Sequence, residues 1–354
     1  MPLGLAGFAV SCVMLPGALL GWRFGALVDR FGAKRIALVG LLLAAAASVG
    51  GGFASSFLIL VGLRIAEGFG YTFLVVAATV IVAQLSTGRS ALALSVWSSF
   101  APIGFALGQW AAAFAAGASP LVLIGVVHAA VLAAAAVALH SAVNSHAPSR
   151  EQHEGGSSWK VVRHVPAQRT ALAFGATCAV LLAAVALAPV VLASRTGLPV
   201  AHTASLTALA ALPGIIGRIA PGWLLGRGVT PRAVFLWASL IAALSILAAL
   251  LAPVPLWSAL AWFALFQIAA GALPGVLSAM IPRVAPRPGQ LGSVSGICTQ
   301  MVNVGNLLGP PLALAVYAAV GAAAAVGLLV ALLAASVIAI AGLSVFRRSL
   351  SEAA

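Results

Sequence analysis

Long hydrophobic runs alternate with short polar breaks along almost the entire chain. A helix needs about 20 apolar residues to cross a bilayer, and only helices or closed barrels satisfy their backbone groups in lipid. The runs are long and rich in Ala and Leu, which favours helices. They lie approximately at 3–22, 36–54, 57–84, 91–116, 120–141, 170–192, 203–225, 233–252, 256–280, 291–317 and 321–346. We therefore predict an all-α membrane protein with about eleven transmembrane helices.

The composition excludes a soluble protein. Hydrophobic residues make up 63% of the 354 residues and charged residues 6%, and the mean hydropathy is +1.16, whereas a soluble domain carries about 25% charged residues. The net charge of +13 is not gathered on one face or tail, so no nucleic-acid partner is expected. The three cysteines lie far apart in apolar runs and have no metal-binding spacing, so no metal or cofactor is expected.

Basic residues gather in alternate polar breaks, as on the cytoplasmic side of a membrane protein. Fifteen of the eighteen lie in these breaks or in the C-terminal tail, and the other breaks hold only Arg195. The fifteen are Arg23, Arg30, Lys34, Arg35, Arg89, Arg150, Lys160, Arg163, Arg169, Arg227, Arg232, Arg283, Arg287, Arg347 and Arg348. We expect the C-terminus in the cytoplasm. The excess of Arg over Lys and the many Ala residues indicate a GC-rich bacterial gene, hence the bacterial cytoplasmic (inner) membrane.

The longest polar break divides the chain into five and six predicted helices. It contains Pro, Gly, Ser, His and mixed charges, a composition typical of a flexible linker. We therefore predict an N-terminal bundle over 1–141, a cytoplasmic linker over 142–169, a C-terminal six-helix bundle over 170–346 and a cytoplasmic tail over 347–354.

The second half repeats a short pattern of the first, one Gly followed by two basic residues. The two copies have identical spacing and are shifted by 197 residues. They consist of Gly25, Arg30 and Arg35, and of Gly222, Arg227 and Arg232. Repeated halves are typical of secondary transporters.

On these residues the chain resembles the Major Facilitator Superfamily. The signature between the family's second and third helices, G-x-L-a-D-R-x-G-r-k-x, matches the segment GALVDRFGAKR, residues 25–35, at almost every position. The Arg and Gly-rich turn of the family's fourth helix resembles residues 64–70. The resemblance implies two pseudo-symmetric bundles of five and six helices, with the family's helices 2 to 6 in the first. The family's first helix has no counterpart: either the protein is naturally short or its start site was placed too far downstream, and we favour the latter.

The resemblance also implies a function for segment 25–35. In the family it is a cytoplasmic latch that favours the outward-facing state, here formed by Gly25, Asp29, Arg30, Gly32, Lys34 and Arg35. Asp29 can pair with a nearby Arg or with the positive N-terminus of a neighbouring helix. The alternative is that the segment only anchors the topology. Because Gly226 stands at the place of Asp29 in the second copy, we expect a weaker latch there.

Two charged residues lie three positions apart inside one predicted span. Arg64 and Glu67 share a helix face, and each charge within a bilayer costs about 2.5 kcal/mol or more and is functional by default. A structural ion pair and a proton-coupling site both fit this spacing, and the family resemblance also implies proton coupling at Arg64. His128 can titrate near neutral pH, but the sequence shows no partner for it.

Three residues of the second half are candidates for substrate binding. Arg218 lies within a span and has no acid nearby in sequence, so it can contact an anion or extend to the interface. Its Gly-Arg-x3-Gly-Trp context resembles anion-carrying branches of the superfamily. Gln300 and Asn303 share a helix face and can bind substrate or link helices by hydrogen bonds.

The sequence contains no nucleotide-binding loop, zinc-protease motif or nucleophile elbow, so no enzymatic activity is expected. We predict a monomeric secondary transporter whose partners are the lipid bilayer, a small-molecule substrate and protons. Proton-coupled symport or antiport of a small organic or inorganic anion is favoured over proton-driven multidrug efflux. Exporters of the family often carry the motif G-x-x-x-G-P-x-x-G-G in the first half, and here Ala101 replaces the Gly before Pro102. The alternative of another class is a non-transporting membrane sensor or a truncated fragment.

Overall fold

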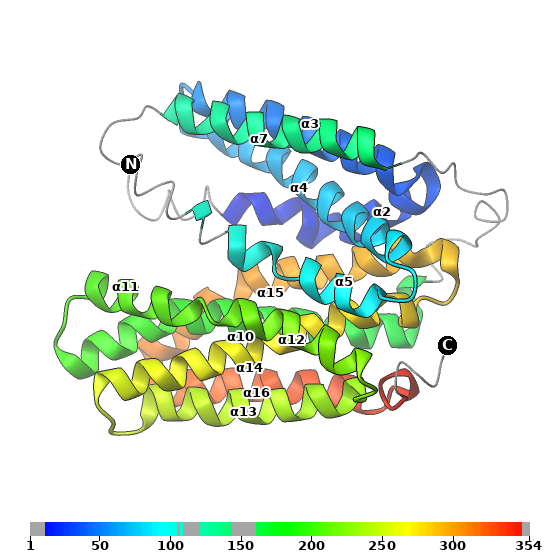
Figure 1. Ribbon diagram of the computed structural model, residues 1–354. Coiled ribbons are helices and arrows are strands. Elements are labelled where there is room, and N and C mark those ends of the chain that lie inside the picture. The colour runs from blue at the N-terminus through cyan, green and yellow to red at the C-terminus, as the bar shows by residue number, and fades with distance from the viewer. Residues whose placement is uncertain (1–10, 105–106, 109–120, 144–160, 349–354) are drawn as a thin grey trace. The chain divides into compact units, whose positions relative to one another are not determined.

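The computed structural model describes residues 11–104, 107–108, 121–143 and 161–348, which are helical with short connections and no strand (Figure 1). The helices are α2 (Leu15–Phe31), α3 (Ala33–Gly52), α4 (Phe57–Leu85), α5 (Ser90–Trp97), α7 (Leu121–Ala142), α10 (Val165–Thr196), α11 (Val200–Ala211), α12 (Gly214–Gly226), α13 (Pro231–Leu251), α14 (Leu256–Val284), α15 (Leu291–Val320) and α16 (Ala322–Ala341), with short 3-10 helices η1 (Cys12–Met14), η2 (Pro288–Gln290) and η3 (Ser344–Phe346). The all-α prediction is confirmed.

Among the described residues, ten helical segments are long and apolar enough to cross a membrane. They overlap ten of the eleven predicted spans. The remaining prediction, 91–116, coincides with the apolar helix Ser90–Gly104, and most of its second half lies outside the described residues. The helix of the first predicted span, 3–22, extends beyond the end of that span. The helical segment continues to Phe31, because a single charged side chain such as Arg23 does not end a helix.

What ends α2 is Gly32. Its φ of 91° lies in the left-handed region that favours glycine, and α3 begins at the next residue. Gly32 therefore makes the sharp turn between α2 and α3.

The described chain forms two compact units. Unit 1 comprises residues 1–85, 107–168 and 285–303, and unit 2 comprises residues 86–106, 169–284 and 304–354, as far as these ranges are described. Each unit thus takes one segment from the other half of the sequence. The division predicted from sequence, into 1–141, 142–169, 170–346 and 347–354, stays a prediction, and residues 144–160 and 349–354 lie outside the described residues.

In unit 1, α3 packs against both α4 and α7, and α2 packs against α4. The contact between α3 and α4 is close because Gly40 and Gly70 face each other. A Cβ atom added to Gly40 would lie 2.6 Å from the carbonyl oxygen of Gly70. Small residues let helix backbones approach in this way and bring together van der Waals contacts that hold helices in lipid.

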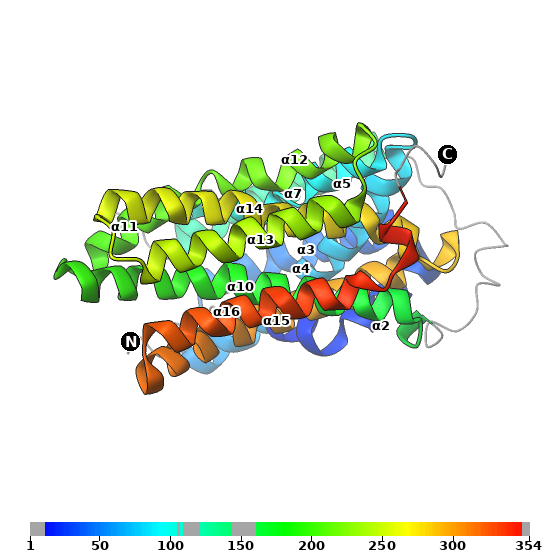
Figure 2. The same ribbon diagram turned by 90° about the horizontal axis from the view of Figure 1, so that it is seen from below.

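In unit 2, α14 packs against α5, α12 and α13, and α13 also packs against α16 (Figures 1 and 2). Glycines again mark the closest approaches. Gly217 of α12 lies against the backbone of Ile268 on α14, and Gly309 of α15 lies against Ala179 on α10.

Arg195, the exception in the distribution of basic residues, has a structural partner in unit 2. Its guanidinium donates hydrogen bonds to the carbonyl oxygens of Ala249, at 3.2 Å, and Ala252. These carbonyls lie at the C-terminus of α13, where helix carbonyls lack intrahelical partners and a cation is favoured by the helix dipole.

Candidate functional site

The carboxylate of Asp29, in the last turn of α2, lies at the N-terminus of α15 within unit 1. Its Oδ1 accepts a hydrogen bond from the backbone N–H of Gly292 at 2.7 Å. Its Oδ2 accepts from the backbone N–H of Ser293 at 2.7 Å and from the Ser293 hydroxyl at 2.6 Å. The first N–H groups of a helix lack intrahelical partners and carry partial positive charge. Of the two pairings expected for Asp29, the structure therefore shows the one with a helix N-terminus.

Glycines allow α2 and α15 to approach closely enough for this contact. A Cβ atom on Gly25 would overlap the backbone of Gly292 and would lie 2.8 Å from the Cα atom of Ser293. One turn earlier, a Cβ atom on Gly21 would lie 2.6 Å from the carbonyl oxygen of Gly296. The close approach expected of Gly25 is present, and the glycines facing it on α15 were not predicted.

The basic residues of segment 25–35 have different surroundings. Lys34 donates from Nζ to the carbonyl oxygen of His140, at 2.8 Å, near the C-terminus of α7. Arg30 lies over the ring of Phe31, with Cζ 5.1 Å from the centroid, and Arg35 is exposed. Lys34 therefore joins α3 to α7.

The second copy of the pattern lies in unit 2 and lacks the acid. Gly222 of α12 approaches α5, because a Cβ atom there would lie 2.6 Å from the Cα atom of Leu92. Arg227 stacks on the ring of Trp223 at 3.3 Å, and Arg232 lies at the start of α13. Nothing lies within 4 Å of a Cβ atom placed on Gly226.

Two serines make equivalent hydrogen bonds in the two units. Ser95 of α5 donates to the carbonyl oxygen of Gly275 on α14 at 3.1 Å, and Ser295 of α15 donates to that of Val76 on α4 at 3.4 Å. The serines are 200 residues apart in sequence and the acceptors 199, close to the 197-residue shift of the repeat. The repeat thus includes, besides the glycine and arginine pattern, the hydrogen bond between α5 and α14 and its counterpart between α15 and α4. Its shift was the signal that could have identified these serines.

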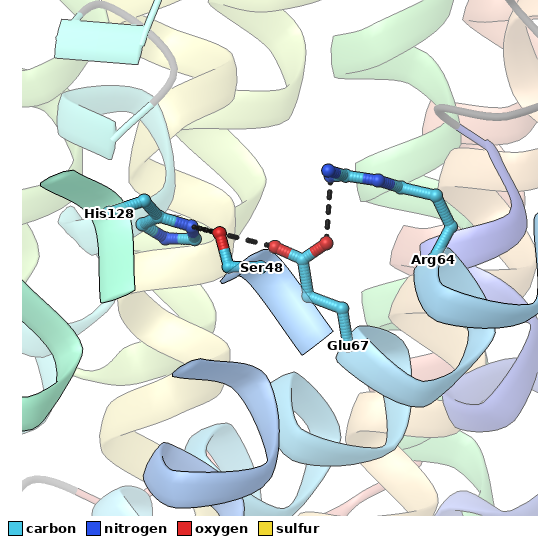
Figure 3. A network of polar contacts seen from close by, with 4 residues as sticks. All are labelled: Ser48, Arg64, Glu67 and His128. Carbon is cyan, nitrogen blue, oxygen red and sulfur yellow. Dashed lines mark hydrogen bonds and ion pairs between the residues drawn. The ribbon is translucent and has the colours of Figure 1, made fainter. Parts of the chain in front are cut away.

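A polar network joins α3, α4 and α7 in unit 1 (Figure 3). The Glu67 carboxylate is at its centre, and the Glu67 residue is 7% exposed. Its Oε2 lies 2.7 Å from Nη1 of Arg64, and its Oε1 lies 3.6 Å from Nδ1 of His128. The same Nδ1 lies 2.9 Å from Oγ of Ser48. The ion pair allowed by the sequence spacing is present, but it is part of a larger network.

The partner of His128 could not be found from the sequence, and the structure supplies two. Ser48 and His128 meet because α3 and α7 pack closely, with Gly125 of α7 against the backbone of Ser48. Ser48 is 14 residues from Lys34 along α3, or about 21 Å at 1.5 Å per residue. The network is therefore far from the end of unit 1 at which Asp29 lies.

Arg218 is partly buried on α12 in unit 2. Its Nη1 donates to the carbonyl oxygen of Ser98, directly after α5, at 2.8 Å. A Cβ atom on Gly271 of α14 would lie 3.6 Å from Cγ of Arg218. The guanidinium is therefore held beside α5 and the side chain passes along α14.

Gln300 and Asn303 both face α2. Gln300 Oε1 accepts from the backbone N–H of Trp22 at 3.1 Å. Asn303 is 3% exposed and donates from Nδ2 to the carbonyl oxygen of Thr299 at 2.8 Å, while its amide contacts the position where Gly17 would carry a Cβ atom. The Gln300 contact fits the linking of helices, the alternative to substrate binding, whereas the hydrogen bond of Asn303 stays within α15.

Comparison with known proteins agrees with this architecture. The chain resembles three solved structures, each at 18% identity and over 95% of this chain: a variant of the E. coli fucose:proton symporter FucP (TM-score 0.74, 90% of that chain), the human organic anion transporter MFSD10, also called TETRAN (0.75, 83%), and FucP in the outward conformation (0.70, 88%). No curated protein matches the sequence. The sequence profile described as the Major Facilitator Superfamily matches residues 1–266. The chain therefore belongs to the Major Facilitator Superfamily of transporters.

Proposed function

We propose that the protein is a proton-coupled secondary transporter of a small anion. The observation that carries this proposal is the Glu67 carboxylate, which is almost fully buried in a membrane span between Arg64 and His128. A carboxyl group at such a depth is functional by default, and its charge changes when it takes up a proton. Alternating exposure of this site to the two sides would couple the movement of protons to that of the substrate.

Arg218 supports an anionic substrate. It lies within a predicted span of unit 2, and its position between α5, α12 and α14 is inside the helix assembly. A guanidinium presents its donors in a plane and suits carboxylate and other oxyanions. Among the similar structures, one protein is an organic anion transporter and another is a proton symporter, and the same two properties are proposed here together.

We assign the contact of Asp29 with α15 to the latch of the outward-facing state. Three hydrogen bonds to one carboxylate stabilise the state in which α2 and α15 are joined. With the basic breaks in the cytoplasm, this latch lies on the cytoplasmic side of the bacterial inner membrane, as does the C-terminus. A monomer can carry out this cycle, because the proton site and Arg218 lie in one chain.

A ligand-stabilisation experiment tests the proposal. The purified protein is heated in detergent with nitrate, phosphate, lactate or citrate, or with a cationic drug such as tetraphenylphosphonium, at pH 5.5 and 7.5. A ligand that binds only the folded state adds about 2.7 kcal/mol of stability at a concentration 100-fold above its Kd. We expect one or more anions to raise the melting temperature and the Arg218→Gln variant to lose that shift.

Arg227→Gln is the matched control, since this residue lies on the same helix but stacks on Trp223 at its exposed end. The control variant should keep the anion-dependent shift. Stabilisation by the cation alone, lost in Glu67→Gln, would replace the proposal by multidrug efflux. For an anion that binds, uptake into proteoliposomes should increase with an inward proton gradient, and uptake indifferent to that gradient would refute proton coupling.

A further inference from the structure

The arrangement around Glu67 contains more than one group that can bind a proton. The two carboxylate oxygens face different cations: Oε2 faces Arg64 at 2.7 Å, and Oε1 faces the imidazole of His128 at 3.6 Å. The side chains of Arg64 and His128 are 33% and 49% exposed, whereas that of Glu67 is 10% exposed. One buried carboxylate thus lies between a permanent cation and a potential one.

We propose that His128 is a second proton-binding residue of the coupling site and that, when protonated, it competes with Arg64 for the carboxylate of Glu67. This inference rests on the proposed proton-coupled function and extends it to a residue on another helix. The proton adds to the lone pair of Nδ1, so no other bond is made or broken.

The position of Nδ1 explains how protonation of His128 would change its interaction with Glu67. In the neutral ring Nδ1 can accept the hydroxyl hydrogen of Ser48, from which it is 2.9 Å away. After protonation Nδ1 becomes a donor and faces two acceptors, the Ser48 oxygen and the Glu67 carboxylate. A small movement shortens the 3.6 Å separation to an ion pair, because opposite charges attract strongly where water is scarce.

Protonation would also change the charge of the network. With neutral His128, Arg64 and Glu67 compensate each other. With protonated His128, one carboxylate faces two cations, and the network carries one net positive charge inside a span, which is unfavourable. A monovalent anion bound next to this network would reduce this cost. Uptake of one proton is therefore expected to favour binding of one anion.

Four further ionisable residues lie on the described parts of α3, α4 and α7: Lys34, Arg35, Tyr71 and His140. Lys34 and His140 contact each other at the ends of α3 and α7 that are far from this network, and Arg35 follows Lys34. Tyr71 is one turn after Glu67 on α4.

A double-mutant cycle tests the inference without any substrate. Melting temperatures of the wild-type protein, His128→Gln, Glu67→Gln and the double variant are compared at pH 5.5 and 7.5, on either side of the value near 6.5 at which an isolated imidazole titrates. We expect the two substitutions to be non-additive at pH 5.5 and close to additive at pH 7.5, because residues in contact show interaction energies that distant residues lack.

His140→Gln combined with Glu67→Gln is the matched control. His140 lies on the same helix, and its contact with Lys34 is made by the backbone, so this pair should be additive at both pH values. Additive behaviour of His128 and Glu67 at both pH values, or equal coupling at both, would overturn the inference. If Glu67→Gln does not yield folded protein, Glu67→Asp withdraws the carboxylate by one methylene and serves in the same cycle.

A second measurement separates this inference from the proposed function. In the wild-type protein the melting shift caused by a bound anion should be larger at pH 5.5 than at 7.5, and His128→Gln should remove that difference. If proton-driven uptake occurs but His128→Gln leaves its pH profile unchanged, the proposed function stands and the role of His128 is refuted. If the cycle shows the expected coupling but no proton-driven transport occurs, the proposed function fails and the protonation of His128 stands.

Discussion

Replacement of Asp29 by Asn should open the contact between α2 and α15. The carboxylate accepts three hydrogen bonds, from two backbone N–H groups and one hydroxyl. An Asn side chain offers one oxygen, and its NH₂ group cannot accept from the remaining donors. The variant also loses the attraction between the carboxylate charge and the positive N-terminus of α15.

The size of the effect follows from the bonds that are lost. Hydrogen bonds to a charged group contribute about 1.5–3 kcal/mol each; at least one is lost, and those that remain are no longer made to a charged acceptor. Because Asp29 is only partly buried, water replaces part of this contribution, and we take about 2 kcal/mol for the total. Since about 1.4 kcal/mol corresponds to a factor of ten, the open fraction should rise by roughly 30-fold.

The opening can be measured with a thiol placed at Ser295. This side chain is 1% exposed and contacts α4, so a cysteine there reacts with a maleimide only when α15 separates from its neighbours. The three native cysteines are replaced by Ala in the same chain. The labelling rate reports the open fraction when closing is faster than labelling. We expect labelling to be roughly 30-fold faster in the Asp29→Asn variant than in the same protein with Asp29 unchanged.

Arg30→Gln is the control, because Arg30 is the neighbouring charge and lies over Phe31 rather than at α15. It should label at the rate of the unsubstituted protein. Equal labelling rates in all three proteins would refute the view that the carboxylate holds this junction closed. Equal acceleration by both substitutions would indicate a general effect of charge near the membrane surface.

Three further predictions concern stability and use the melting temperature as the readout. Gly226→Asp should raise the melting temperature by supplying a cap to the N-terminus of α5, where no side-chain cap is present and a cap contributes about 1 kcal/mol. A decrease would contradict the equivalence of the contact between α12 and α5 with that between α2 and α15. Gly40→Val should lower the melting temperature, because overpacking costs about 1–3 kcal/mol, whereas Gly62→Val should leave it unchanged, since nothing lies within 4 Å of its Cβ position. Similar decreases of the melting temperature in both variants would argue against a specific contact at Gly40. Arg195→Gln should lower the melting temperature and Arg195→Lys should restore part of the loss, and an unchanged value in Arg195→Gln would show that the carbonyls of α13 do not need this partner.

The sequence predicted the fold well because transmembrane helices leave a simple signal. Each span must be apolar over its whole length, and the breaks carry most of the charges. The apolar run alone does not give the end of the first helix, because α2 continues past Arg23 to Phe31. Only Gly32, with its left-handed backbone, ends that helix.

Contacts between candidate residues could be predicted from the sequence where the partners are close along the chain. Arg64 and Glu67 are three residues apart on one helix, so their ion pair follows from helical geometry. Ser48 and His128 are 80 residues apart, and their meeting depends on the packing of α3 against α7. For Asp29, its chemistry indicated a helix N-terminus as a partner, but which helix supplies it is a property of the tertiary structure.

The close glycine contacts also have a consequence for the gene. Glycine codons begin with GG, so every change at the first or second base replaces glycine by a larger residue or a stop signal, and only third-base changes are silent. Where Gly21, Gly25, Gly40 and Gly217 touch a neighbouring backbone, the smallest possible substitution already causes overlap. In a survey of random point mutations, these codons should therefore tolerate almost nothing but synonymous change, whereas the codon of Gly62 should accept replacement. The glycine codons that tolerate no amino-acid replacement would then identify the close helix contacts within each unit.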